Sequence, residues 1–354
     1  MDTTDPSEDR RYARQELLPD FGRASQRRLA VGHAVIVGCG ALGCVSADLL
    51  VRAGVGRVTL IDRDIVEPTN LQRQSLYTEA DVAEGLPKVE AAKRRLSAVN
   101  SGIEIVAHAS DLTPANARRL TEAADVLVDG TDNFETRFIL NDLAVERGTP
   151  YVYGGAVGTR GMAFTVLGHD ERQSGRLPCV RCLFPEPPPP GSQPTCDTAG
   201  VLGTVVAMVG AYQAGEALKL LIGRSDLVMR SLLDFDPWNG ERRRLDLNGT
   251  RSGKCRCCVE RRFDFLDAKR GGGTATLCGR DAVQVSPVNG APVDLEALHA
   301  RIEPIADATL GPFTVRLTLE SGVRLTVFRD GRAMVQGVTD PAKARAIYDR
   351  VIGG

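Results

Sequence analysis

The chain has 354 residues, of which 43% are hydrophobic and 25% charged, and its formal net charge is −1. These values are typical of a folded globular protein with one large and one smaller domain, and they do not favour nucleic acid or an anionic membrane as the main partner. The polar N-terminal segment, MDTTDPSEDRRYARQ, lacks the apolar core of a secretory signal, so we expect a cytoplasmic protein.

The first part of the chain alternates strands with helices. Apolar runs over His33–Gly38 and Arg57–Asp62 predict strands, and residues 41–54 between them predict a helix. Such a βαβ unit requires parallel strands. Further strands are predicted over Ile103–Ala107 and Val126–Asp129, and further helices over Pro87–Asn100, Pro114–Ala123 and Asn133–Arg147. We therefore expect an α/β fold with a doubly wound sheet.

The pattern changes after Tyr151. The runs YVYGGAV and MAFTVL are short β segments that indicate an antiparallel extension, which would make the sheet mixed. The prolines from Pro185 to Pro194 favour an extended, exposed loop. An apolar helix over Gly200–Gly223 follows, too soon interrupted by charge to span a bilayer. Two more strands are predicted over Val228–Phe235 and Glu241–Leu247.

Gly271-Gly272-Gly273 predicts a linker that divides the chain into residues 1–270 and 271–354. In the tail, Val315–Glu320 and Val323–Phe328 alternate apolar with polar residues, which is typical of a β-hairpin. Asp330-Gly331 marks another turn, and Pro341–Ile352 predicts a final helix. We expect a small α+β domain.

The turn after the first strand, Gly38-Cys39-Gly40-Ala41-Leu42-Gly43, fits the pattern G-x-G-x-x-G. Its glycines let a phosphate approach the backbone in front of a helix N-terminus. Asp62 lies 19 residues after Gly43, at a strand end where a carboxylate can bind ribose hydroxyls. These two features alone favour an NAD-dependent oxidoreductase. A tight turn without a ligand is the other alternative.

A Walker A loop is absent, since Gly249–Lys254 has the wrong glycine spacing and is followed by Cys255. Other polar residues near predicted strand ends would have to hold a triphosphate at the carboxyl edge of the sheet. Two cations and an acid there suit a magnesium-bound polyphosphate that loses pyrophosphate. The candidates are Asp64, Asn70, Arg73, Gln74, Lys88, Asp132 and Asn133.

Each candidate also has a simpler interpretation. A solvated surface charge is the alternative for Arg73 or Lys88 taken singly. A helix N-cap is the alternative for Asp132, which can keep that role even if it binds metal.

Two Cys-x-x-Cys pairs, Cys179/Cys182 and Cys255/Cys258, offer four thiolates for tetrahedral zinc. Because Cys255 comes 73 positions after Cys182, the metal would tie distant segments together rather than form a compact finger. Such closed sites are structural. A redox role for the pairs is the alternative, and Cys257 could replace Cys258 as ligand or be a free thiol.

Cys196 lies in PTCDTAGVLG, between the proline-rich loop and the apolar helix. A thiol near a helix N-terminus has a lowered pKa and is a better nucleophile. Cys196 is therefore a candidate catalytic residue, and a small buried core residue is the alternative.

Taken together, these segments resemble the ThiF/MoeB/HesA family of sulfur-carrier adenylyltransferases, relatives of the ubiquitin-activating enzymes. The resemblance implies a Rossmann-like adenylation domain that forms a homodimer and binds ATP and Mg²⁺. It implies transfer of AMP to the C-terminal glycine carboxylate of a ubiquitin-like sulfur carrier ending in Gly-Gly. The matching segments, in chain order, are RYARQ, VIVGCGALGC, LIDRDIVEPTNLQRQ, PKVEAA, DGTDNFETR, CVRCLFPEPPPP, CDTAGVLG and CRCC.

The resemblance also implies roles for individual residues. Asp62 would hold the ribose, Asp132 would bind magnesium, and Arg14 would reach the neighbouring subunit's nucleotide. Cys196 would form a thioester or persulfide with the carrier. Phosphate contacts or positioning would fall to Asn70, Arg73, Gln74 and Lys88, and zinc to Cys179, Cys182, Cys255 and Cys258.

The chain departs from the family in places. Ala41 stands where many members have glycine, and the tail is not the rhodanese domain of some relatives. Sulfur would then come from a separate sulfurtransferase or cysteine desulfurase, although Cys278 in the tail is a minor candidate to receive it. We regard the terminal Gly353-Gly354 as chance. A zinc-stabilised scaffold without catalysis is the remaining alternative.

Overall fold

The structure is a computed structural model. It describes residues 11–168, 177–188, 196–268, 282–285, 293–304, 306–319 and 321–352, with 196 and 197 described by their backbone alone. The chain groups into two compact units, residues 1–79 with 87–271 and residues 80–86 with 272–354. The predicted division after residue 270 stays a proposal, because the linker predicted at 271–273 lies outside the described residues.

One eight-stranded sheet forms the centre of the larger unit, in the order β3-β2-β1-β4-β5-β6-β7-β8. The first five strands of this order pair in parallel, and β6, β7 and β8 continue the sheet antiparallel. This arrangement confirms the predicted α/β fold with a Rossmann-like mixed sheet. The strands are β1 (His33–Val37), β2 (Arg57–Ile61), β3 (Glu104–His108), β4 (Val126–Asp129), β5 (Tyr151–Val157), β6 (Arg160–Val166), β7 (Ser231–Asp236) and β8 (Glu241–Asp246).

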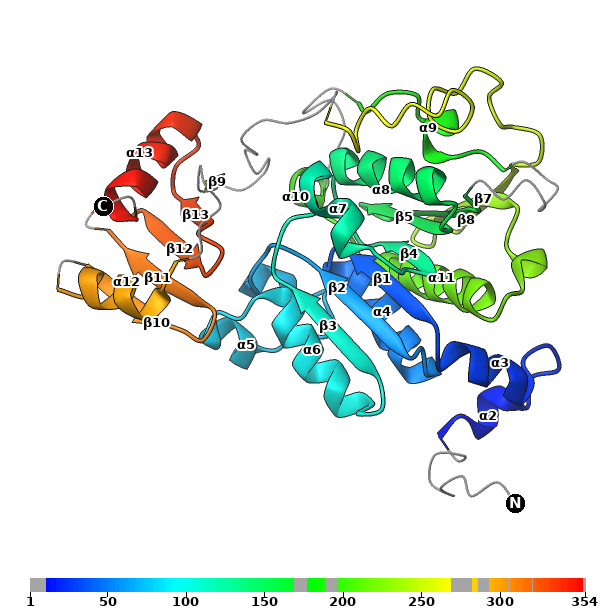
Figure 1. Cartoon of the computed structure of the whole chain (residues 1–354), viewed down its shortest axis with the longest axis horizontal. Helices are drawn as coiled ribbons and strands as arrows, with labels where there is room; N and C mark the ends of the chain where they lie inside the picture. Colours follow the sequence, from blue (N-terminus) through cyan, green and yellow to red (C-terminus); the bar gives the residue numbers. More distant parts are fainter. Residues whose placement is uncertain are drawn as a thin grey trace. The chain divides into compact units, whose positions relative to one another are not determined.

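Helices cover both faces of this sheet (Figure 1). One face carries α4 (Ala41–Ala53), α6 (Lys88–Val99) and α11 (Gly203–Leu221), and the other carries α7 (Pro114–Leu120) and α8 (Phe134–Arg147). Strands β1 and β4 are buried along their whole length, as parallel strands between two helical layers must be. Short helices complete the chain up to residue 227: α2 (Ala13–Glu16), α3 (Gly22–Leu29), α5 (Glu79–Glu84), α9 (Val180–Leu183), α10 (Cys196–Ala199) and the 3₁₀ turns Pro68–Asn70 and Ser225–Leu227.

Two predicted elements begin later than expected. The helix predicted from Gly200 begins at Gly203, because Gly200 has a φ of 72° and cannot continue a right-handed helix. The strand predicted from Val228 begins at Ser231. There the Met229 N–H donates to the Glu216 carboxylate at 2.8 Å. No prediction covers α2, α3 or α5, which are short and polar.

Two turns at the carboxyl edge of the parallel strands meet through their backbones. A Cβ added to Gly38, after β1, would lie 2.4 Å from the carbonyl oxygen of Gly130, after β4. Cβ atoms on Gly130 and Gly43 would lie 2.0 Å and 1.9 Å from the Gly38 carbonyl oxygen. Glycine at these three positions therefore lets β1, β4 and α4 converge at one point.

A five-stranded antiparallel sheet forms the smaller unit, in the order β10-β11-β12-β13-β9. Residues from its strands and from the helices α12 (Leu295–Ile302) and α13 (Pro341–Val351) share one hydrophobic core. The predicted hairpin is confirmed as β11 (Thr314–Thr318) paired with β12 (Arg324–Phe328), and the final helix as α13 (Pro341–Val351). The remaining elements are β9 (Ala282–Val285), α12 (Leu295–Ile302), β10 (Asp307–Leu310) and β13 (Ala333–Gln336).

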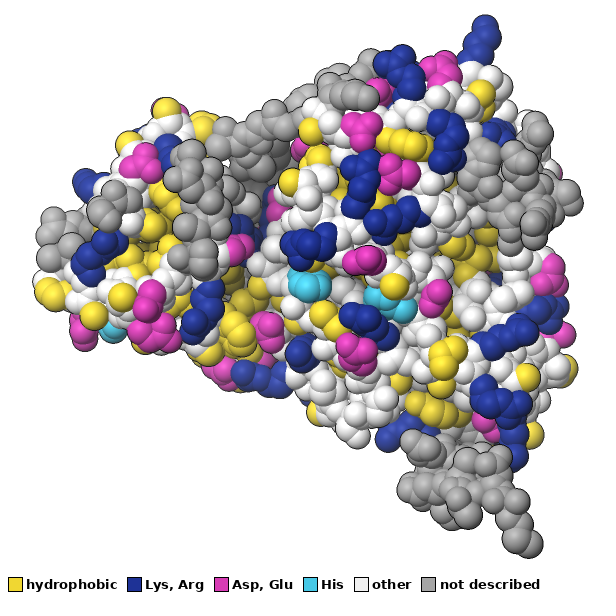
Figure 2. Space-filling view, in the orientation of Figure 1, with side chains coloured by type: hydrophobic (Ala, Val, Ile, Leu, Met, Phe, Trp, Pro, Cys, Tyr) yellow, Lys and Arg dark blue, Asp and Glu magenta, His cyan; other side chains and the backbone are white. Residues whose placement is uncertain are grey.

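The surface has mixed charge. Figure 2 shows basic and acidic side chains interspersed over the face that it presents. Among the described residues, no helix is long and apolar enough to cross a membrane.

We predict that Gly38→Ala destabilises the larger unit more than Gly240→Ala does. Gly38 (φ 89°) and Gly240 (φ 73°, between β7 and β8) are both left-handed, but a Cβ on Gly240 meets nothing within 4 Å. Gly240→Ala should therefore cost only the backbone strain of about 1–2 kcal/mol. Gly38→Ala should cost roughly 2 kcal/mol more, because it also overpacks the Gly130 turn. Urea unfolding measures both, and equal losses would contradict the close approach.

Candidate functional site

The glycine turn brings a helix N-terminus to the carboxyl edge of the sheet. Gly40 is the extended N-cap of α4, Ala41 begins the helix, and Gly43 is buried in its first turn. The first N–H groups of a helix have no partner within it and carry a partial positive charge. This part of the predicted site can therefore face an anion.

Asp62 lies against this turn. Its carboxylate accepts hydrogen bonds from the backbone N–H of Cys39 and of Asp64, both at 2.7 Å. Burial raises the pKa of Asp62, and the positive charge of Lys88 opposes that shift. The two hydrogen bonds fix the end of β2 beside the glycine turn.

Lys88 is buried at the start of α6, with 4% of its side chain exposed. Its Nζ donates to Asp64 at 2.9 Å, so the alternative of a solvated surface charge is wrong for this residue. Arg63, which sequence reasoning missed, lies 2.7 Å from Asp111 and 3.9 Å from Asp64. Two cations and two carboxylates thus alternate beyond the ends of β2 and β3. The position of Arg63 within LIDRD, directly after a predicted strand end, was the sequence signal that could have identified it.

The segment after β2 buries two of the predicted side chains. Asn70 accepts a hydrogen bond from the Glu67 N–H at 3.0 Å within the capping box of the 3₁₀ turn. Gln74 is buried, and its Oε1 atom has no hydrogen-bond partner in the described part of the chain. Buried acceptors are rarely left unpaired, so this atom suits a hydrogen supplied by a ligand.

Arg73 lies between these two residues in the sequence. It is partly buried, and its Nη1 donates to the Thr69 carbonyl at 2.8 Å. A Cβ on Gly203 would lie 3.8 Å from the Cβ of Arg73. Arg73 therefore lies beside the start of α11.

Asp132 and Asn133 lie in the turn between β4 and α8. The N-cap of α8 is Asn133, whose side chain accepts from the Thr136 N–H at 2.9 Å. The N-cap alternative for Asp132 is therefore wrong, because the helix begins one residue later than that role requires. The Asp132 side chain is exposed and accepts from the Asn133 side-chain amide at 3.5 Å. It is free to point toward a ligand.

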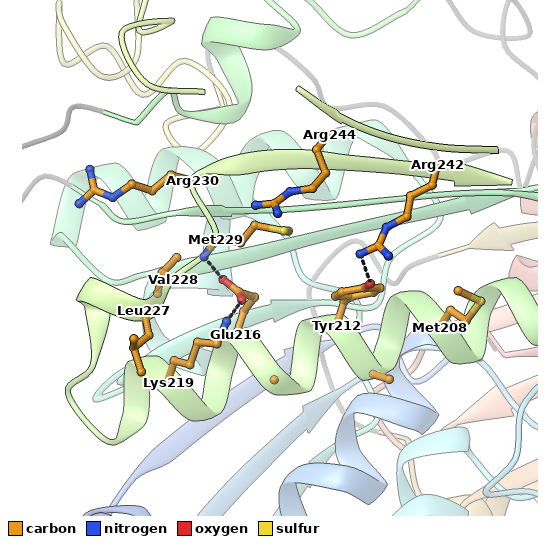
Figure 3. A pocket seen from close by; sticks show the side chains of 12 residues that line it. Met208, Tyr212, Glu216, Lys219, Leu227, Val228, Met229, Arg230, Arg242 and Arg244 are labelled. Atoms are coloured by element: carbon orange, nitrogen blue, oxygen red, sulfur yellow. Dashed lines mark hydrogen bonds and ion pairs between the residues drawn. The ribbon is translucent and has the colours of Figure 1, made fainter. Parts of the chain in front are cut away.

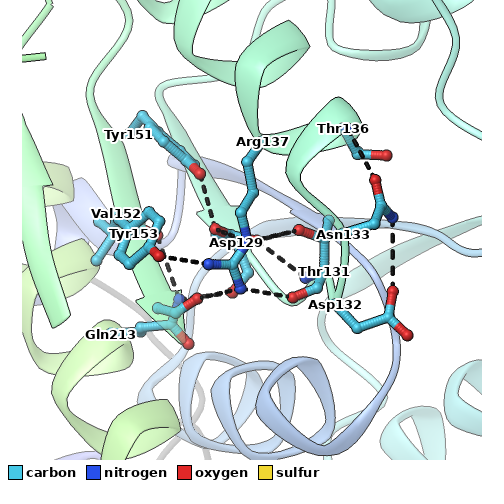
Figure 4. A network of polar contacts seen from close by, with 11 residues as sticks. Asp129, Thr131, Asp132, Asn133, Thr136, Arg137, Tyr151, Val152, Tyr153 and Gln213 are labelled. Atoms are coloured by element: carbon cyan, nitrogen blue, oxygen red, sulfur yellow. Dashed lines mark hydrogen bonds and ion pairs between the residues drawn. The ribbon is translucent and has the colours of Figure 1, made fainter. Parts of the chain in front are cut away.

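A buried polar network lies behind this turn (Figure 4). Asp129 accepts from the Tyr151 hydroxyl at 2.7 Å, and Arg137 donates to the Thr131 carbonyl at 2.8 Å. Sequence reasoning assigned neither Asp129 nor Arg137 a role, although both lie in DGTDNFETR. An aspartate that ends a buried strand and an arginine on the buried side of the next helix were the available signals.

Arg14 does not join these residues within the chain. It is exposed on α2, whose next residue, Gln15, donates to the Ala53 carbonyl at 2.9 Å. Ala53 ends α4, and the glycine turn lies at the beginning of that helix. A helix of 13 residues is about 20 Å long, so α2 and the glycine turn lie at opposite ends of it.

Cys196 begins α10, and its side chain lies outside the described residues. The chain that follows returns to the carboxyl edge, where the Gly158 N–H donates to the Gly200 carbonyl at 2.8 Å. Of the proline-rich loop predicted over Pro185–Pro194, the structure describes residues 185–188, and these are non-helical as predicted. Cys278 and Gly353-Gly354 lie outside the described residues.

The four cysteines of the two pairs form one cluster. All their sulfur atoms lie within 4.8 Å of one another, with Cys179 at 3.9 Å from Cys182 and 3.6 Å from Cys255, and Cys182 at 3.5 Å from Cys258. A tetrahedron of sulfurs about 2.3 Å from a zinc ion has edges of roughly 3.8 Å. The cluster therefore has the donor set and size for one such ion.

Cys257 lies beside this cluster but is not one of its four cysteines. It is fully buried, and its sulfur accepts from the side-chain amide of Asn141 at 3.3 Å. The Asn141 carbonyl oxygen accepts from the Val180 N–H at 2.8 Å. Asn141 on α8 thus holds both Cys-x-x-Cys segments, and Cys258 rather than Cys257 completes the four-sulfur set.

A groove of about 750 Å³ lies between α11 and the β7–β8 hairpin (Figure 3). Its lining includes one acid, Glu216, which accepts from the Met229 N–H and from Lys219. None of the predicted site residues lines it. Its basic residues are Lys219, Arg230, Arg242 and Arg244.

Several known proteins are similar to this chain in sequence. The ThiF family model matches residues 12–257. The chain is 41% identical over 345 residues to the "Sulfur carrier protein ThiS adenylyltransferase" of Bacillus subtilis, covering 97% of this chain and 99% of that protein. It is 42% identical over 248 residues to the "Sulfur carrier protein adenylyltransferase" of Thermus thermophilus, covering 70% and 90%. A Culex quinquefasciatus "Adenylyltransferase and sulfurtransferase MOCS3" is 42% identical, but the match spans 55% of its length.

Solved structures show the same fold. E. coli MccB with ATP has a TM-score of 0.60 and 24% identity, over 71% of this chain and 75% of that one. PaaA has a TM-score of 0.56 and 21% identity, over 70% and 76%. None of the relatives named here is called an oxidoreductase, so they give that alternative no support. Because the family match spans more than half of the chain and the Bacillus protein aligns over nearly its whole length, the chain belongs to the ThiF family.

Proposed function

We propose that this chain is an enzyme that uses ATP and Mg²⁺ to adenylylate the C-terminal glycine carboxylate of a ubiquitin-like sulfur carrier protein. The product would be ready for thiocarboxylate or thioester formation. The observation that carries the proposal is 41% identity, over 99% of its length, to a Bacillus protein named for this activity. The anion-facing helix, the buried cation and the exposed carboxylate at one sheet edge support it.

The nucleotide would bind across the glycine turn. Asp62, which is held beside the glycine turn, would accept hydrogen bonds from the ribose hydroxyls. The unpaired oxygen of Gln74 would accept a hydrogen from the nucleotide, and Asn70 would position that segment. The N-terminus of α4 would face the phosphates, with Gly38 and Gly40 allowing close approach.

Chemistry would take place beside Asp132, which would hold the magnesium ion with help from Asn133. Bound magnesium would neutralise charge on the polyphosphate. A carboxylate oxygen of the carrier would attack the α-phosphorus, forming the acyl–phosphate bond as the bond to pyrophosphate breaks. Lys88 and Arg73 would stabilise the negative charge that collects on the leaving pyrophosphate. Lys88 must exchange its Asp64 partner for phosphate oxygens, or share itself between them.

A homodimer would complete the site. Arg14 lies at the opposite end of α4 from the glycine turn, so it cannot serve the nucleotide of its own chain as α2 is placed. An arginine from α2 of a second copy would add a cation at the leaving phosphates.

Sulfur transfer would follow activation. The thiolate of Cys196 would attack the acyl adenylate, releasing AMP and forming a thioester. Alternatively, Cys196 would first receive sulfane sulfur from a donor persulfide, and the resulting Cys196 persulfide would attack the acyl adenylate, releasing AMP and forming an acyl disulfide. The sulfur itself would come from a separate sulfurtransferase or cysteine desulfurase. The relative named as both adenylyltransferase and sulfurtransferase is matched over only 55% of its length.

Zinc would occupy the cysteine cluster as a structural ion. It would join the α9 segment, Cys179–Cys182, to the segment holding Cys255 and Cys258, both of which pack against α8. Four protein ligands leave no open position, so this site would hold structure and take no part in transfer.

The function is tested by carrier-dependent exchange of labelled pyrophosphate into ATP. We expect exchange with at least one β-grasp carrier ending in Gly-Gly, and none without magnesium. Asp132→Ala should lower the rate by roughly 10²–10³-fold, by loss of charge stabilisation, without changing the unfolding midpoint. Glu135→Ala, an exposed acid on the same helix end, is the matched control and should keep the rate. Full exchange by Asp132→Ala would remove the magnesium assignment.

Metal analysis tests the cysteine cluster. The purified chain should hold about one zinc per chain. Cys258→Ser should lose it and lower the thermal midpoint, whereas Cys257→Ser should retain it, because Cys257 is not one of the four clustered cysteines and bonds Asn141. Loss of zinc in Cys257→Ser but not in Cys258→Ser would show that the cluster is assembled differently.

A further inference from the structure

A buried carboxylate, that of Asp129, accepts hydrogen bonds from the turn that carries Asp132. Asp129 is fully buried at the end of β4. One of its oxygens accepts from both the backbone N–H (2.9 Å) and the hydroxyl (2.7 Å) of Thr131, and the other accepts from the Tyr151 hydroxyl at 2.7 Å. The Asp129 carbonyl accepts from the side-chain amide of Gln213, on α11, at 2.6 Å. The base of the turn is therefore held on both sides of the sheet.

Arg137 donates hydrogen bonds to the same turn from α8 (Figure 4). Only 9% of its side chain is exposed, and its Nη2 donates to the carbonyls of Thr131 and Gly154, both at 2.8 Å. Its Nη1 donates to the Tyr153 hydroxyl at 2.5 Å, and its Nε lies 3.5 Å from the nearer Asp129 oxygen. One guanidinium thus joins α8, the turn and β5.

These hydrogen bonds fix the orientation of the peptide bond between Thr131 and Asp132. The N–H, the hydroxyl and the carbonyl of Thr131 are all held by Asp129 and Arg137, whereas the Asp132 carboxylate is exposed with one weak contact. We infer that Arg137 and Asp129 are positioning residues for adenylylation, which fix the turn so that the Asp132 carboxylate meets the metal–nucleotide without reorganising. This inference rests on the proposed function.

The buried Arg137–Asp129 pair contributes more to the geometry of the turn than to the free energy of unfolding. Burying an ion pair costs desolvation, and well-packed apolar residues often stabilise a core equally well. The planar fork of arginine can bond two carbonyls and a hydroxyl at once, and lysine cannot reproduce that geometry. A preorganised ligand loses less free energy on binding, and a site loosened by about 1 Å loses much of its advantage.

Two variants and a matched control test the inference. Arg137→Lys keeps the charge but loses the fork, and Thr131→Val removes only the hydroxyl and serves if the first variant fails to fold. Arg181→Lys is the control, because Arg181 is also buried (1% exposed side chain) and lies between Asp142 and Asp264, beside the cysteine cluster. Calorimetric titration gives the Kd for ATP with excess Mg²⁺ and with EDTA, and unfolding midpoints show that each variant is folded.

The ratio of the two Kd values reports what magnesium adds to binding. We expect a large ratio for the wild type and for Arg181→Lys, a decrease of about tenfold for Arg137→Lys, and of roughly threefold for Thr131→Val. Unchanged ratios in both turn variants, or an equal decrease in Arg181→Lys, would overturn the inference. Wild-type protein that binds Mg–ATP but never exchanges pyrophosphate would instead count against the proposed function, and a lowered ratio in the turn variants would then still show that Arg137 and Asp129 position Asp132 for the metal–nucleotide.

Discussion

The backbone contact between the turns after β1 and β4 is the constraint on which the rest of the site depends. The Gly38 carbonyl oxygen lies where a Cβ on either Gly43 or Gly130 would clash. The contact brings together a helix N-terminus and the turn that carries Asp132, and these have opposite electrostatic character. An anion held by the first is thereby presented to the carboxylate, and to any cation on it, at the second.

Charges around this point are paired before any ligand arrives. Lys88 bonds Asp64, and Arg63 bonds Asp111, so the attraction within each pair offsets part of the free-energy cost of removing these charges from water. A polyphosphate would compete with these carboxylates for the same cations. Lys88 and Arg63 can therefore exchange carboxylate oxygens for phosphate oxygens, whereas the Asp129–Arg137 pair is buried among protein groups.

The sequence predicted most of the sheet, because parallel strands buried on both faces leave unbroken apolar runs such as those of β1 and β4. It also predicted that the two Cys-x-x-Cys pairs come together, and the four sulfur atoms do form one cluster. It did not predict Arg63, Asp129 or Arg137, because their partners are set by how strands and helices pack. The N-cap of α8 was misplaced by one residue for a similar reason: both Asp132 and Asn133 are good caps, and only the backbone geometry decides between them.

Mass spectrometry of the carrier tests the central claim most directly. Incubated with this chain, ATP and Mg²⁺, a β-grasp carrier ending in Gly-Gly should gain the mass of one adenylyl group, and a carrier lacking the last glycine should not. With sulfide present, the adenylate should give way to a thiocarboxylate. A panel of such carriers left unmodified by a folded, zinc-loaded protein would contradict the account.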